Sequence, residues 1–316
     1  MRFSSFSVAT ASALALGASL LATAAPIQKR TASATDIQVL QFANVLEQFE
    51  TQFYTQVLAK FSEQDFISAG YLNAEIAIQQ FQSIQIDETV HTNTLSQTIV
   101  DLGAQPLNTC QFNFESILTE VSVMATNARV IENLGVAAYL GAARLLSDPV
   151  LLTSATTILT VEARHQTVLN ILNVGSAIPS GFDIPFTPSE VLSIASQFIS
   201  GCDLGYLANP TLSLTNSGVI APGTSLTFSS SSFSSVSVDT LFCQILVGGA
   251  PFATVLPYNA CVIPQINGPA AVFITSDQQP LANNIRDQAT DKIIAGPSFA
   301  FIDTKTEVIS QITRAH

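Results

Sequence analysis

The chain has 316 residues, enough for two domains with a sizeable core, and carries a formal net charge of −12 at pH 7. Only 11% of its residues are charged and 47% are hydrophobic. So acidic a surface, without a basic patch, repels phosphate backbones, and nucleic-acid binding is therefore not expected. A polar surface with few charges is common among exported proteins.

The N-terminus has the features of a secretory signal peptide. Arg2 gives a positive start, an apolar run follows over residues 8–21, and small residues at 22–25 offer a cleavage site. Lys29-Arg30 resembles a dibasic processing site, so residues 1–30 are predicted to be a signal peptide with a short propeptide. The apolar run is short for a membrane span and no second candidate follows. The protein is therefore predicted to be secreted, either extracellular or associated with the cell wall.

Residues 36–200 show helical periodicity, with apolar residues recurring at spacings of three and four that would face a core. The third long helix is followed by Asp148-Pro149, which places a proline at the first position of the fourth. A capping box over residues 187–190 predicts a short fifth helix that ends near 200. Short or moderate links between long helices predict an antiparallel bundle. The four long helices are predicted over residues 36–61, 69–102, 114–146 and 149–174.

After Cys202 the composition becomes β-rich, and Gly-Gly, Pro-Gly and Gly-Pro turns separate the short runs. Residues 203–210 are predicted to be a linker. The fold class predicted is α+β with two domains, a helical bundle over 31–202 and a β-sandwich of immunoglobulin-like size over 211–316. No catalytic group of residues is expected in the second domain. The strand candidates are Thr211–Thr215, Ser225–Ser229, Thr240–Val247, Ala270–Thr275 and Ser298–Ile302.

The four cysteines predict two disulfides in an oxidising compartment, with three possible connectivities. Cys110–Cys202 and Cys243–Cys261 are favoured, because each bridge then stays within one predicted domain. The serine-rich segment 229–237 is either a site of O-linked sugar or a polar loop.

Both internal histidines lie in the same motif, Glu-x-x-His, at Glu88–His91 and at Glu162–His165. On a helix, positions i and i+3 share one face, so each motif presents a carboxylate and an imidazole together. Glutamate is rare in this chain, and chance seldom places one three residues before both histidines. The repeated motif therefore predicts a metal site inside the bundle.

A two-metal site in a four-helix bundle needs one more inward glutamate from each of the other two helices. Glu47 and Glu132 lie in apolar stretches of the first and third predicted helices and meet this need. Glu50, one turn after Glu47, is the rival on the first helix. Tyr54 and Tyr139 each follow their glutamate by seven residues, an echo typical of two helical hairpins related by an approximate two-fold axis. These tyrosines are redox-active, support the ligands, or simply pack at the edge of the core.

The residue types indicate which metals are expected. Carboxylates bind hard cations and bridge two of them, and imidazole favours iron or manganese over calcium or magnesium. Four carboxylates inside a bundle repel one another, and two divalent cations offset their charge. The prediction is a pair of iron ions, with manganese as the alternative. Without metal, some of the carboxylates are expected to be protonated.

At these residues the sequence resembles the ferritin-like superfamily, in which bacterioferritins, rubrerythrins and manganese catalases share the order Glu, Glu-x-x-His, Glu, Glu-x-x-His. More closely, it looks like the secreted fungal ferritin-like domain proteins linked to stress response and late sexual development. The resemblance covers about residues 36–200 and, more loosely, the tail. It implies six metal ligands, Glu47, Glu88, His91, Glu132, Glu162 and His165.

The resemblance does not carry an activity, because members of the superfamily differ widely in chemistry. One hypothesis is a di-metal oxidoreductase acting as a peroxidase, a catalase-like enzyme or a ferroxidase. The alternative is a non-catalytic metal-binding or structural protein of the cell surface or matrix, whose β domain binds a wall or matrix partner.

Overall fold

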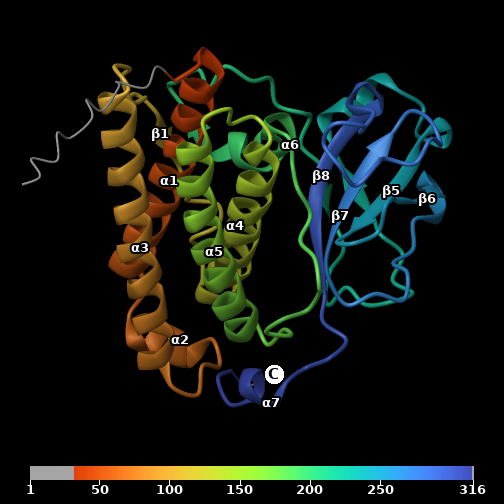
Figure 1. Cartoon of the computed structure of the whole chain (residues 1–316). Helices are drawn as coiled ribbons and strands as arrows, with labels where there is room; N and C mark the ends of the chain where they lie inside the picture. Colours follow the sequence, from red (N-terminus) through yellow and green to blue (C-terminus); the bar gives the residue numbers. More distant parts are fainter. Residues whose placement is uncertain (1–31, 315–316) are drawn as a thin grey trace, which may run out of the picture. The chain divides into compact units, whose positions relative to one another are not determined.

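The computed structural model describes residues 32–314 (Figure 1). The predicted signal peptide and propeptide lie outside the described residues. The first part of the described chain is helical, as predicted, and consists mainly of long helices. These are α1 (Ala34–Lys60), α3 (Ala74–Asp101), α4 (Val121–Ala143) and α5 (Pro149–Leu172).

Capping residues mark the starts of α1 and α3. Ser33 and Asp36 form a capping box at the start of α1. The second predicted helix (69–102) begins later, at Ala74, and a short helix α2 (Glu63–Ser68) that was not predicted precedes it and ends before Gly70 at φ 92°. α3 then starts after Asn73, whose side chain accepts a hydrogen bond from the Ile76 N–H. α4 starts at Val121 rather than near 114, since the preceding segment forms turns.

The direction of the helices follows from contacts between them. Asn44 bonds to Ser96 and Gln85 to Thr55, so α1 and α3 are antiparallel. Hydrogen bonds from α1 to α4 and from α4 to α5 also show antiparallel pairs. α3 and α4 therefore run in the same direction, and the link over 102–120 crosses from one end of the bundle to the other. The predicted simple antiparallel bundle is thus corrected to two antiparallel hairpins joined by one crossover.

Two antiparallel sheets follow the helices, which confirms the predicted fold class (Figure 1). A larger, four-stranded sheet has the order β6-β5-β7-β8, and a smaller one pairs β3 with β4. The strand β6 is absent from the sequence prediction because it is short and ends in a proline. The strands are β3 (Ser213–Leu214), β4 (Phe228–Ser229), β5 (Phe242–Val247), β6 (Thr254–Pro257), β7 (Gly268–Thr275) and β8 (Ile293–Ile302).

The central strand β7 is buried on both faces of the sheet, since alternate residues of a strand point to opposite sides and every residue of β7 is buried. Val272 on β7 packs with Leu212 and Leu226 on the side of β3 and β4. Its neighbour Phe273 joins a core cluster with residues of α4 and of the short helix α6 (Pro188–Ala195). The sheet and the bundle therefore share a hydrophobic core.

A buried arginine also joins the bundle to the end of the sheet. The Arg129 guanidinium on α4 donates two hydrogen bonds of 2.8 Å to Asp303, just after β8, and one to Asn170 on α5. It also stacks on the ring of Phe301. Beyond Asp303, the short helix α7 (Val308–Gln311) returns to the bundle, where the Ser310 hydroxyl bonds to a backbone carbonyl of the loop after α5.

Both favoured disulfides are present. Cys110–Cys202 lies beside a small pairing of β1 (Gln111–Phe112) with β2 (Ile199–Ser200) and holds the crossover link against the end of the helical part. Cys243–Cys261 ties β5 to the segment after β6. Among residues 32–314, no helix is both long enough and apolar enough to cross a bilayer.

Candidate metal centre

The bundle interior brings together all six side chains that the sequence analysis singled out. One comes from α1, two from α3, one from α4 and two from α5. The two Glu-x-x-His motifs point inward because positions i and i+3 of a helix lie on the same face. The four glutamates are fully buried, and the histidines are nearly so.

Potential ligand atoms form two overlapping groups, each with atoms lying within 4.8 Å of one another. Glu88 and Glu162 belong to both groups. The helix pair α1 and α3 completes the first group with Glu47 and His91, and the pair α4 and α5 completes the second. The groups are Glu47, Glu88, His91 and Glu162, and Glu88, Glu132, Glu162 and His165.

The first group is centred on the Nδ1 atom of His91. This atom lies 3.2 Å from Glu47 Oε2, 3.3 Å from Glu88 Oε2 and 3.5 Å from Glu162 Oε1. One imidazole nitrogen thus faces carboxylates from three different helices.

The second group has the same design. His165 Nδ1 lies 2.9 Å from Glu88 Oε1 and 3.2 Å from Glu132 Oε2. The matching arrangement of the two halves agrees with the two-fold echo in the sequence.

The two tyrosines connect the halves reciprocally. Tyr54 on α1 donates a hydrogen bond of 2.5 Å to Glu132 on α4, and Tyr139 on α4 donates one to Glu47 on α1. Both tyrosines are buried. Each therefore orients a carboxylate of the opposite hairpin. This is the second of the three roles considered for the tyrosines from the sequence, support of the ligands.

One contact to the cluster has no signal in the sequence. Asp87 Oδ2 on α3 lies 3.2 Å from the outer nitrogen of His165, Nε2, on α5. A carboxylate behind a metal-binding imidazole fixes the orientation of the ring and raises its basicity. Asp87 precedes Glu88 directly and points to another side of α3, so only the packing of α3 against α5 reveals its role.

Glu50, the rival of Glu47, lies near the cluster but belongs to neither ligand group. It is 3% exposed. Its Oε1 atom lies close to Gly135 on α4, where a Cβ atom would be only 3.1 Å away and would also collide with Glu162. The glycine therefore allows both carboxylates to approach the backbone of α4.

The cluster's electrostatics favour protons when no cation is present. Burial raises the pKa of Glu88 to about 8, helped by the charges of Glu132 and Glu47 and opposed by bonds to the histidines. Burial and neighbouring carboxylates raise the pKa of Glu162 and of Glu50 well above the usual range. This agrees with the expectation that some carboxylates are protonated without metal.

The histidines respond in the opposite sense. Burial alone would lower the pKa of His91, but the neighbouring carboxylates of Glu162, Glu47 and Glu88 outweigh burial and raise the pKa to about 12. Burial likewise opposes a rise at His165, whose pKa reaches about 12 because of Glu132 and Glu88. The cluster thus attracts positive charge strongly.

The residues fit a pair of divalent cations. Among the described residues, four buried carboxylate oxygens of the cluster accept no hydrogen bond of acceptable geometry, and they belong to Glu47, Glu88 and Glu162. Buried polar atoms without partners are rare in folded proteins, and a bound ion is one explanation for them. Oxygen and imidazole donors together suit iron or manganese.

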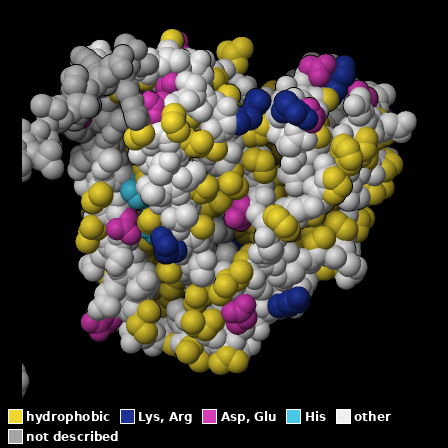
Figure 2. All heavy atoms as spheres, in the orientation of Figure 1, with side chains coloured by type: hydrophobic (Ala, Val, Ile, Leu, Met, Phe, Trp, Pro, Cys, Tyr) yellow, Lys and Arg dark blue, Asp and Glu magenta, His cyan; other side chains and the backbone are white. Residues whose placement is uncertain are grey.

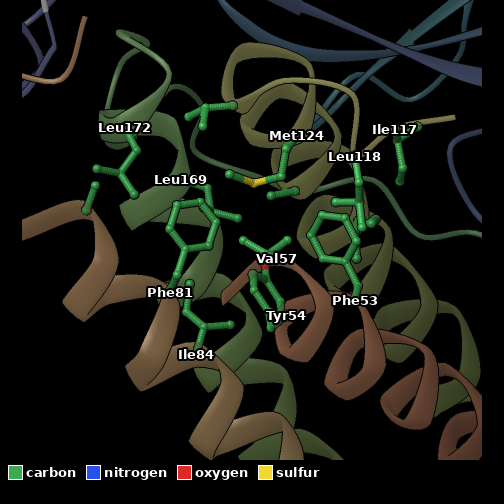
Figure 3. Packing of buried hydrophobic residues seen from close by; sticks show 14 of the residues in the cluster. Phe53, Tyr54, Val57, Phe81, Ile84, Ile117, Leu118, Met124, Leu169 and Leu172 are labelled. Carbon is green, nitrogen blue, oxygen red and sulfur yellow. The ribbon is translucent and has the colours of Figure 1, made fainter. Parts of the chain in front are cut away.

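The cluster is shielded on one side and closer to solvent on another. Toward the end of the bundle where α1 ends and α3 begins, Phe53, Val57, Phe81 and Met124 pack around Tyr54 (Figure 3). By contrast, histidine atoms reach the surface on the side of the molecule where α3 and α5 lie (Figure 2).

A four-helix bundle with one crossover and a buried carboxylate–histidine cluster defines the ferritin-like class of helical proteins. Residues 35–174 match the family model for the ferritin-like domain. The match supports placing the helical part of the chain in the ferritin-like superfamily, with a cluster compatible with a di-metal site. No curated protein matches the chain significantly.

Proposed function

We propose that the protein binds two redox-active metal ions, iron in the first instance and manganese as the alternative. The supporting observation is the pair of overlapping ligand groups that share Glu88 and Glu162. Those two carboxylates would bridge the ions, while Glu47 with His91 and Glu132 with His165 would be terminal ligands. The orphaned buried oxygens support the same proposal.

A pair of such ions supplies one-electron and two-electron chemistry with dioxygen or peroxide. The protein's part is to hold the ligands in place. Tyr54 and Tyr139 restrain the carboxylates of the opposite hairpin, and Asp87 restrains the ring of His165. The packed aromatic residues beside Tyr54 exclude water from one end of the site. The protein would thus act as a di-metal oxidoreductase toward peroxide or dioxygen.

The proposed location is outside the cell. Two disulfides are consistent with an oxidising compartment. Roles in stress response or sexual development, a fungal source, and a wall or matrix partner for the β part stay predictions that rest on the resemblance alone.

The test is elemental analysis of the secreted protein beside a Glu88→Ala/Glu162→Ala variant. The expected result is close to two iron or manganese ions per chain, lost in the variant. Loaded protein is then assayed for hydrogen peroxide turnover and for oxygen-dependent Fe(II) oxidation. Metal without either activity would favour the non-catalytic metal-binding alternative, and no metal after anaerobic loading with Fe(II) or Mn(II) would overturn the proposal.

A further inference from the structure

A cavity of about 200 Å³ lies inside the end of the bundle where α1 and α5 begin. Its walls are apolar and come from all four long helices. They include Leu40 and Leu46 of α1, Ala138 and Ala142 of α4, and Leu151 and Ile158 of α5. The interior on the other side of the metal cluster is filled by aromatic and aliphatic side chains (Figure 3). This cavity therefore lies on the opposite side of the cluster from that packing.

The inner end of the cavity reaches the metal cluster. Glu50 is the one charged side chain among the lining residues, and it is almost fully buried. Among residues 32–314, no group hydrogen-bonds to its carboxyl. Gly135 also lines the cavity, and the carboxylates of Glu50 and Glu162 meet beside it. Tyr139, which bonds to Glu47, forms another part of the wall.

The outer end of the cavity has a polar rim. Thr94 on α3 and Ser154 and Thr157 on α5 are exposed and also line the cavity. A path from solvent thus runs between α3 and α5, past hydroxyl groups, along apolar walls and up to a carboxyl beside the cluster. A ligand pocket typically has this combination of an apolar body and a few placed polar groups.

We propose that this cavity binds a small neutral molecule with an apolar body and one hydroxyl-type group. Glu50 holds the hydroxyl group, and the apolar body lies among the side chains of α1, α4 and α5. An apolar cavity of about 150 Å³ holds one benzene molecule, so the space suits a molecule of about that size or slightly larger. Anions are disfavoured because the apolar walls would leave a buried charge without a partner. We infer further that this molecule is the substrate that approaches the metals, and this part of the inference rests on the proposed function.

The experiment measures binding of phenol and benzene to the purified protein by calorimetry and ligand-observed NMR, with and without metal. Ala142 lines the cavity and Ala143, the next residue on α4, does not. Ala142→Leu fills part of the space and should weaken phenol binding by about tenfold or more, as overpacking predicts. Ala143→Leu should bind phenol as the wild type does. Glu50→Met should lose the preference for phenol over benzene.

Equal phenol affinity in the two alanine variants, or no binding of either probe by the wild type, would overturn the inference. A second test does not depend on the folding of Ala142→Leu. Xenon in a crystal of the wild type should lie among the cavity residues, and xenon found only elsewhere would refute the site. Probe binding by protein that takes up no metal would overturn the proposed function alone. Metal uptake without probe binding would overturn the cavity inference alone.

Discussion

Replacing Glu162 by glutamine should have nearly opposite consequences in metal-free and metal-loaded protein. Glutamine keeps the size of the side chain but removes a carboxylate that both ligand groups share. In metal-free protein, burial and the charge of Glu88 raise the pKa of Glu162 well above its usual range, which favours the neutral form of the carboxyl. Replacing it with a neutral amide should therefore leave the Tm within about 2 °C of the wild type or raise it.

In loaded protein the same change should remove most of the stabilisation by metal. An ion present at one hundred times its Kd stabilises the folded state by about 2.7 kcal/mol, so two ions contribute about 5 kcal/mol. At about 2 °C per kcal/mol for a chain of this size, the wild type should gain about 10 °C on loading. Glu162→Gln weakens both positions, and its gain should fall to a few degrees.

Differential scanning calorimetry of both forms, with metal content measured on the same samples, provides the assay. Glu190→Gln is the matched control, because Glu190 is another buried carboxyl whose pKa burial raises to about 7, but it caps α6 away from the cluster. This control should keep the full gain on loading. The reasoning is wrong if Glu162→Gln retains the gain as well, or if its metal-free form loses many degrees.

Three further outcomes are expected. Burial and neighbouring charges raise the pKa of Glu88 from 4.5 to about 8. Its contribution to the stability of metal-free protein is therefore lost as the pH rises through that range, whereas metal displaces its proton more easily. The difference in Tm between loaded and metal-free protein, measured by calorimetry, should grow from pH 5 to pH 8. Arg129→Met removes the charge partner of the partly buried Asp303 carboxylate and should cost about 3 kcal/mol in urea unfolding. A second change, Asp303→Leu, should recover part of this cost. Gly135→Ala pushes a methyl group against the carboxylate of Glu162 and should weaken metal affinity in a titration by about tenfold or more. The control Gly181→Ala has open space around it and should not change this affinity.

Local patterns in the sequence were sufficient for much of the fold. Amphipathic periodicity identified the long helices, and Asp148 with Pro149 located the start of α5 correctly. The start of α4 was missed because Phe114, Ile117 and Leu118 are buried in turns and continue the apolar pattern without being helical. Periodicity reports which side chains are buried, and burial alone does not distinguish a turn from a helix.

The sheet shows the same limit. Runs of β-branched and aromatic residues located β5 and β7, but the position of the sheet against α4 and α6 depends on which face each residue occupies. Phe273 packs toward the helices and Val272 away from them. A strand buried on both faces has no alternation of apolar and polar residues that would reveal its surroundings.

The sequence by itself determined the composition of the candidate site, because the spacing of Glu88 with His91 and of Glu162 with His165 is a local property of one helix. It left Glu47 and Glu50 as rivals, since residues one turn apart share a face. Only the tertiary structure shows that Glu47 contributes an oxygen to one group of potential ligand atoms and that Glu50 lines a cavity. The assignment of Glu47 as a metal ligand stays a prediction. The tertiary structure alone also shows the sharing of two carboxylates, the reciprocal tyrosine bonds and the contact of Asp87. These features join different helices, and such contacts depend on the crossover and on helix packing rather than on spacing within one helix.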